Sequence, residues 1–68
     1  MAIRLTVNGE PREALDGATV GAVVASVTGQ AGGVAAAVNG EVVPRGSWDG
    51  APLRDGDQVE IVTAVQGG

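Results

Sequence analysis

The sequence predicts one domain of the α+β class, with one helix packed across a mixed sheet of about five strands. Two Asn-Gly pairs, at positions 8–9 and 39–40, separate short apolar segments, as is typical of two-residue β-hairpin turns. Between these hairpins, valines follow Thr19 at the spacing of one helix face. A last alternating segment, residues 58–63, completes the order β-β-α-β-β-β.

The first hairpin begins with residues 2–7, in which Ile3, Leu5 and Val7 alternate and share one face of a strand. Both central positions of a type I′ turn need a positive φ, which an Asn-Gly pair tolerates. Residues 10–15 form the return strand. Because Pro11 has no backbone N–H to donate, we expect this strand at an edge of the sheet or just beginning there.

The helix is expected to start after Thr19, whose hydroxyl can cap it, and to bury the valines at positions 20, 23, 24 and 27. Valine is a mediocre helix former, and Gly21 costs about 1 kcal/mol relative to alanine. Packing against a sheet must therefore hold this helix. Gly29 is the expected C-terminal cap, before a flexible loop.

The second hairpin joins residues 34–38 to residues 41–43, and a loop rich in glycine and proline follows over residues 44–52. Trp48, the single aromatic residue, lies in this loop. We expect it to anchor the loop over the edge of a core that has no other large side chain.

In the last strand, Val59 and Ile61 are expected to face the core. Glu60 and Val62 then lie on the opposite face. One helix laid across a mixed sheet of two hairpins and a central final strand is the ubiquitin-like β-grasp roll, and this is the architecture that the pattern predicts.

The composition limits the chemistry available to the chain. With 68 residues it can build one small core, and it contains no cysteine and no histidine. Disulfides, thiol nucleophiles, and the usual zinc ligands and general base are therefore excluded. Its hydroxyl groups also lack a histidine or lysine to activate them. We do not expect an enzyme; chemistry must come from carboxylates, a terminus or a partner.

The charge pattern argues against nucleic acid and membranes as partners. The net charge is −4, and the four cations are arginines scattered along the chain. No apolar run reaches the length of a membrane span, and the N-terminus lacks the layout of a signal peptide. We expect a cytoplasmic location.

The acidic pairs have simple structural interpretations. Asp55 and Asp57 flank a glycine, but two carboxylates supply too few oxygens for a calcium site, so we expect a turn and no metal. The acids at positions 10 and 13, or 16 and 49, could be offered as acid–base pairs. Solvated surface charge is the interpretation that we favour.

The C-terminal glycines carry a possible mechanism. Gln66, Gly67 and Gly68 can bury little apolar surface, so we expect a β-grasp domain over residues 1–63 and a flexible tail over residues 64–68. Without side chains, the last two residues can thread a narrow channel in another protein. Five extended residues reach roughly 17 Å, which is enough to place the terminal carboxylate in a partner's active site.

These segments together resemble the ThiS family, the sulfur carriers of thiamin biosynthesis. The most specific are residues 38–45, with the sequence Val-Asn-Gly-Glu-Val-Val-Pro-Arg, and residues 53–68, which end in Gly-Gly. The resemblance covers nearly the whole chain. It departs from the family at the helix, where Val23-Val24 replace a usual Leu-Leu pair and residues 21–22 lack the usual acidic residue.

The resemblance implies a reaction cycle. A partner would adenylate the Gly68 carboxylate with ATP, sulfur would replace the adenylate, and the thiocarboxylate would donate sulfur during thiazole formation. The implied partners are an E1-like (ThiF-like) adenylating enzyme, a ThiG-like thiazole synthase and a sulfur donor such as a cysteine desulfurase. The chain itself would bind no cofactor. Val62, Glu60 and Val65 are the expected docking residues, Val62 because a carrier must dock through an apolar patch.

Other functions remain open at this level. Within the carrier class, the chain could be the small subunit of molybdopterin synthase or a carrier for cysteine synthesis, because the partner decides where sulfur goes. From other classes, it could be a non-catalytic β-grasp binding module or a protein-conjugating modifier. A binding module would not need a free Gly-Gly terminus.

Overall fold

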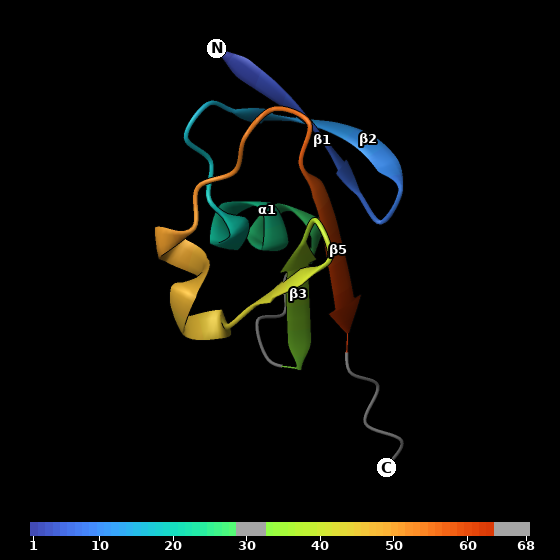
Figure 1. Cartoon of the computed structure of the whole chain (residues 1–68), viewed down its shortest axis with the longest axis vertical. Helices are drawn as coiled ribbons and strands as arrows, with labels where there is room; N and C mark the ends of the chain where they lie inside the picture. The colour runs from blue at the N-terminus through green and yellow to red at the C-terminus, as the bar shows by residue number, and fades with distance from the viewer. Residues whose placement is uncertain (29–32, 64–68) are drawn as a thin grey trace.

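The structure is a computed structural model, and it describes residues 1–28 and 33–63. One helix lies across one face of a five-stranded sheet (Figure 1). The elements follow one another as β1 (Ala2–Val7), β2 (Glu10–Leu15), α1 (Val20–Val27), β3 (Val34–Val38), β4 (Glu41–Val43), the 3₁₀ helix η1 (Arg45–Gly50) and β5 (Gln58–Thr63). The predicted α+β class and element order are confirmed.

The strand order is β2-β1-β5-β3-β4, so the last strand in the chain is the central one in the sheet. β5 runs parallel to β1 and antiparallel to β3. β2 forms one edge of the sheet. Pro11, which has no backbone N–H to donate, therefore lies on an edge strand, as predicted. The architecture is the predicted mixed sheet of two hairpins and a central final strand.

Both hairpin turns have the backbone conformation that their sequences predict. Asn8 and Asn39 each have φ 52°, and Gly9 and Gly40 each have φ 82°. These positive angles belong to type I′ turns, whose twist matches that of the flanking strands. The turns set the register, which pairs Val7 with Glu10 and Val38 with Glu41.

The side chain of Asn8 extends the pairing between β1 and β5 beyond the end of β1. Direct parallel pairing covers only Thr6 with Gln58 and Val7 with Val59. The Asn8 amide then donates from Nδ2 to the Ile61 carbonyl at 3.1 Å and accepts from the Ile61 N–H at 2.8 Å. One side-chain amide therefore takes the place of the next backbone pair in the ladder.

The side chain of Asn39 holds the other side of β5, at its start. Its Oδ1 accepts a hydrogen bond from the Gln58 N–H at 3.0 Å, and its backbone N–H donates to the Gln58 carbonyl at 2.7 Å. Its Nδ2 donates to Asp57 at 3.1 Å. The two Asn-Gly turns thus hold the central strand from both sides.

The core lies between α1 and the sheet and consists largely of small aliphatic side chains. Its one aromatic residue, Trp48, is buried and donates from Nε1 to the Val43 carbonyl at 2.9 Å. This confirms Trp48 as the anchor of its loop. The buried residues are Ile3, Leu5, Val7, Val20, Val23, Val24, Ala36, Trp48, Leu53, Val59 and Ile61.

Residues 45–50 differ from the prediction, because they form η1 where the sequence predicted an irregular loop. The turn is held by local hydrogen bonds, from the Ser47 N–H to the Pro44 carbonyl and from the Ala51 N–H to the Trp48 carbonyl. A single short 3₁₀ segment has no apolar periodicity that a sequence pattern could reveal.

The helix begins as predicted, because the Thr19 hydroxyl accepts a hydrogen bond from the Ala22 N–H at 3.2 Å. Its first turn contains no acidic residue. However, η1 brings Asp49 there: a Cβ at Gly21 would lie 2.6 Å from Oδ1 of Asp49. A carboxylate at this end of a helix is favourable, so Asp49 supplies from another element the charge that the first turn lacks.

The helix ends at Val27 with Thr28 as its cap residue, and the Thr28 N–H donates to the Val24 carbonyl. The sequence predicted Gly29 as the cap, and Gly29 lies outside the described residues. The extended backbone of Thr28 already stops the helix one residue earlier than that prediction placed it.

Removing the Asn8 side chain should loosen β5 at one identifiable place. We expect Asn8→Gly, which keeps the positive φ, to lower the free energy of unfolding by about 1–2 kcal/mol, because the Ile61 N–H loses its acceptor. Amide hydrogen exchange should accelerate at Ile61 more than at Gln58. Asn39→Gly is the matched control and should show the reverse order. Equal acceleration in both variants would contradict the assignment.

The contact of Gly21 with Asp49 should appear as a coupling in stability. In a helix interior, Gly→Ala stabilises by about 1 kcal/mol. We expect Gly21→Ala to gain less than this in the wild-type chain, because the new methyl group displaces the Asp49 carboxylate, and to gain the full amount with Asp49→Ala. Urea unfolding of the four chains measures the coupling. A coupling of zero would show that Asp49 does not act on the helix.

Candidate docking face and C-terminal tail

The site predicted from the sequence has two parts, a C-terminal tail and the outward face of the last strand. The tail residues Val65, Gln66, Gly67 and Gly68 lie outside the described residues. The predicted threading by the glycines, the docking role of Val65 and the flexibility of residues 64–68 therefore stay predictions. The structure describes the strand that leads to them.

That strand is supported as far as its last described residue. β3 pairs with β5 along its length, and the pairs Ala35 with Val62 and Val34 with Thr63 reach the C-terminal end of the strand. On the other side, the Asn8 amide holds Ile61. The last three residues of the strand are thus held by the sheet up to Thr63.

The outward face of β5 carries two of the predicted docking residues. Val59 and Ile61 are buried against α1, whereas Glu60 is exposed and Val62 is 61% exposed. The predicted alternation is confirmed. An exposed valine near the end of a central strand is a free apolar surface, because no described element covers this face of the sheet.

Val62 does not stand alone, because the register brings further apolar residues beside it. Ala35 and Ala37 on β3 and Val42 on β4 lie on the same face, and Val42 is 73% exposed. Together these four residues form what we call the apolar hollow, a depression of about 130 Å³ that Glu60 also borders. The two alanines are short, so the valines stand as its rims.

Sequence reasoning missed the other three residues of the apolar hollow. The signal was present in part, since alternation along residues 34–38 places Ala35 and Ala37 on one face once Ala36 is known to be buried. The pairing of Ala37 with Val42 also follows from the two-residue turn at 39–40. What the pattern could not give is the pairing of Ala35 with Val62, because it depends on the register between β3 and β5.

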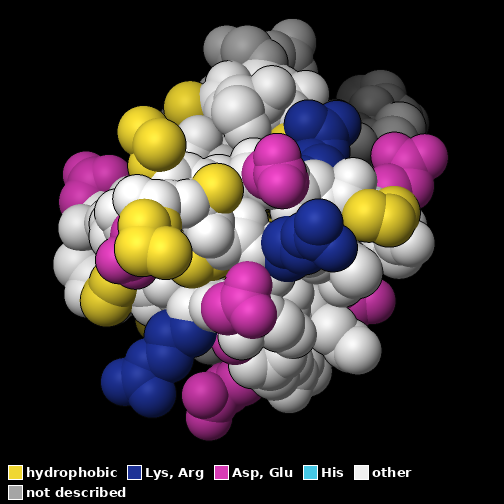
Figure 2. Space-filling model, turned by 90° about the horizontal axis from the view of Figure 1, so that it is seen from above, with side chains coloured by type: hydrophobic (Ala, Val, Ile, Leu, Met, Phe, Trp, Pro, Cys, Tyr) yellow, Lys and Arg dark blue, Asp and Glu magenta, His cyan; other side chains and the backbone are white. Residues whose placement is uncertain are grey.

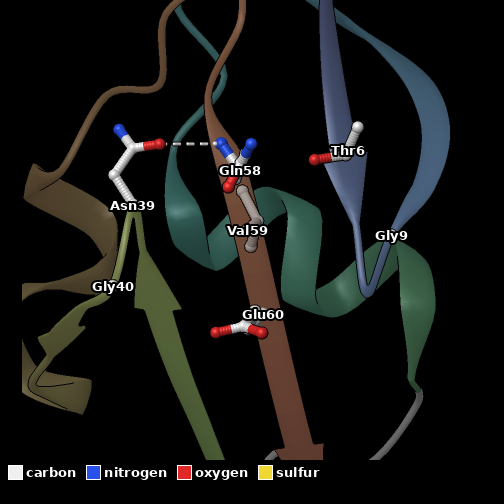
Figure 3. A pocket seen from close by; sticks show the side chains of 7 residues that line it. All are labelled: Thr6, Gly9, Asn39, Gly40, Gln58, Val59 and Glu60. Atoms are coloured by element: carbon white, nitrogen blue, oxygen red, sulfur yellow. Dashed lines mark hydrogen bonds between the residues drawn. The ribbon is translucent and has the colours of Figure 1, made fainter.

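A second depression lies at the other end of the outward face of β5, between the two Asn-Gly turns (Figure 3). We call it the polar hollow. It measures about 600 Å³ and is lined by Thr6 of β1, by Gln58 and Glu60 of β5, and by the turns themselves. Glu60 lies on the wall of both hollows, so they form one continuous surface along β5.

Charges on the described surface are mixed in sign. Figure 2 shows arginines and acids interleaved over one end of the molecule, with no field of a single sign. Arg4 lies 4.0 Å from Glu13, and both side chains are exposed. No group of three or more histidine, cysteine, aspartate or glutamate side chains among residues 1–28 and 33–63 could hold a metal ion.

The acids predicted to form a turn do so. Asp55 accepts a hydrogen bond from the Arg4 N–H at 2.8 Å, and Asp57 accepts from the Arg54 N–H at 2.8 Å. These carboxylates hold the turn before β5 together and link it to β1.

In the described part of the chain, no helix has the length and apolar character of a membrane span.

A helix across a five-stranded mixed sheet, with a central final strand that leads to a Gly-Gly end, defines a ubiquitin-like β-grasp protein. The family model described as "ThiS family" matches residues 5–68. The chain belongs to the ThiS family.

Individual relatives agree with this assignment. The sulfur carrier protein ThiS of Thermus thermophilus is 42% identical over 62 residues, which cover 91% of this chain and 95% of that protein. The crystal structure of the thiamine biosynthesis protein ThiS from Geobacter metallireducens superposes with a TM-score of 0.82 at 33% identity. That superposition covers 97% of this chain and all of that one.

Proposed function

We propose that this protein is the sulfur carrier of thiamin biosynthesis, and that it carries sulfur on the carboxylate of Gly68. The observation that carries the proposal is the family match, which runs from residue 5 to residue 68 and so includes the terminal Gly-Gly. The name of the Thermus thermophilus relative, a sulfur carrier protein, supports the same function. The crystal structure from Geobacter metallireducens is of a thiamine biosynthesis protein.

The proposed chemistry follows from the groups that the chain contains. A carboxylate is a poor electrophile, so a partner enzyme first joins the Gly68 carboxylate to the AMP portion of ATP and releases pyrophosphate. A sulfur nucleophile then displaces AMP and leaves a thiocarboxylate. The sulfur comes from outside, because the chain contains no cysteine. The chain binds neither ATP nor a metal in this scheme; it is a carrier on which enzymes act.

In this scheme, partner enzymes bind the folded domain and thereby position the tail. Val62 and the rest of the apolar hollow offer an apolar contact next to the end of β5. Five residues from position 64 could span roughly 17 Å if fully extended. The partners that we propose are a ThiF-like adenylating enzyme, a ThiG-like thiazole synthase and a sulfur donor such as a cysteine desulfurase, in the cytoplasm.

Intact-mass analysis tests the carrier chemistry directly. After incubation with ATP, a ThiF-like enzyme and a sulfide source, we expect the mass to rise by the difference between one sulfur and one oxygen atom, localised by fragmentation to Gly68. Localisation matters because oxidation of Met1 adds nearly the same nominal mass. Transfer of this sulfur by a ThiG-like thiazole synthase distinguishes the thiamin pathway from those of molybdopterin and cysteine.

The control for this experiment is a chain without Gly68, which should gain no sulfur. An unmodified full-length tail, with an enzyme shown to be active on another carrier, would contradict the proposal and favour a binding module. Attachment of Gly68 to lysines of other proteins would favour a modifier.

The apolar hollow is tested by a substitution that keeps the shape of the side chain. We expect Val62→Thr to leave the free energy of unfolding within about 0.5 kcal/mol of wild type, because Val62 is exposed. The KM for the carrier in adenylation should rise about fourfold, since one apolar carbon is lost from the contact. Val59→Thr is the matched control and should cost about 1–3 kcal/mol in stability. An unchanged KM for Val62→Thr would remove Val62 from the docking surface.

A further inference from the structure

The carboxylate of Glu60 is the unusual group on the outward face of the sheet. In the described part of the chain, Glu13 on the same face lies beside Arg4, and Asp55 and Asp57 in the turn before β5 accept backbone N–H groups. The Glu60 carboxylate takes part in no ion pair or side-chain hydrogen bond among residues 1–28 and 33–63. Within the described part of the chain it is therefore an anion without a partner, and it lies on the wall of the polar hollow.

The polar hollow is open because of the turns that border it. Gly9 and Gly40 have φ 82°, a conformation that side chains other than asparagine and aspartate rarely adopt. A Cβ on either glycine would meet nothing within 4 Å. Because type I′ turns favour glycine at these positions, neither turn places a side chain over the hollow there, and the residues of β5 that line it stay accessible.

The groups that face the polar hollow suit a donor of several hydrogen bonds. Figure 3 shows Thr6 on β1 and Gln58 and Glu60 on β5 around the same space. The hydroxyl, the amide oxygen and the carboxylate can all accept hydrogen bonds. Asn39 is already bound to Gln58 and Asp57. Of the described residues that line the hollow, none is basic.

We propose that the polar hollow receives an arginine side chain of the enzyme that activates Gly68. A guanidinium carries five N–H donors in a plane, so it can bind the Glu60 carboxylate through two of them and direct others to Thr6 and Gln58. An ammonium has the same charge but no such planar fork. The inference rests on the proposed function for the identity of the partner, but not for the chemistry of the hollow.

Continuity with the docking face supports a partner that binds the tail. Glu60 borders both the polar hollow and the apolar hollow, so a protein that covers Val62 also covers Glu60. Glu60 also lies only three residues before the end of β5, from which the tail continues. An enzyme that binds the tail is therefore the protein placed to insert an arginine beside it.

The first test measures cation binding to the polar hollow without a partner enzyme. Ethylguanidinium chloride and ethylammonium chloride are titrated separately into the full chain, and amide shifts are followed by NMR. We expect ethylguanidinium to shift Gly9, Gly40 and Glu60 severalfold more than ethylammonium at equal concentration. Glu60→Gln should remove the difference. Glu13→Gln, which loses the same charge on the same face, should keep it. Equal shifts with both cations, or loss in both variants, would overturn the assignment.

The second test measures how Glu60 contributes to recognition by the activating enzyme. In ATP–pyrophosphate exchange by a ThiF-like enzyme, Glu60→Gln should raise the KM for the carrier about tenfold at unchanged kcat, and Glu13→Gln should stay within about twofold. Both substitutions are exposed, and circular dichroism checks that both variants fold. Equal KM values would overturn the arginine contact. If no such enzyme activates the wild-type chain, the proposed function fails, and with it the partner, whereas the NMR result still decides what the hollow binds.

Discussion

β5 lies between the two hairpins, and the asparagine of each turn hydrogen-bonds to it: Asn39 at Gln58 and Asn8 at Ile61. An asparagine is the residue that can both adopt the positive φ of the turn and offer an amide that imitates a backbone peptide group. The alternation of β5 then follows, with Val59 and Ile61 under the helix and Glu60 and Val62 on the outward face.

The small core explains the arrangement of the remaining elements. Aliphatic side chains of modest size fill the space between α1 and the sheet, and Trp48 closes the edge that they leave open. Burial of Trp48 brings η1 against the start of the helix. That approach places the Asp49 carboxylate beside Gly21. Gly21 is a poor helix former. Because it has no side chain, however, the Asp49 carboxylate can approach the start of the helix, where a negative charge is stabilising.

The outward face of the sheet offers a partner two kinds of contact. The apolar hollow around Val62 offers burial near the tail, and the polar hollow offers oriented acceptors at the other end of the same strand. Burial of apolar surface adds affinity, whereas a charged hydrogen-bonded pair adds register and selectivity. Because Glu60 belongs to both, a partner that satisfies both contacts is held at a defined position along β5.

Local chemistry in the sequence was enough to predict the helix and the five strands, from Asn-Gly turns at 8–9 and 39–40, a Thr19 cap, and alternation in the strands, but not η1. It also predicted a functional carboxylate at Gly68, since a Gly-Gly end needs no tertiary structure to be recognised. Which distant residues lie together was decided by the tertiary structure. The pairing of Ala35 with Val62, and the hydrogen bonds between Asn8 and Ile61, join positions far apart in the chain. These contacts depend on the register between strands that no short turn connects, which the burial of a whole strand face sets and no local pattern encodes.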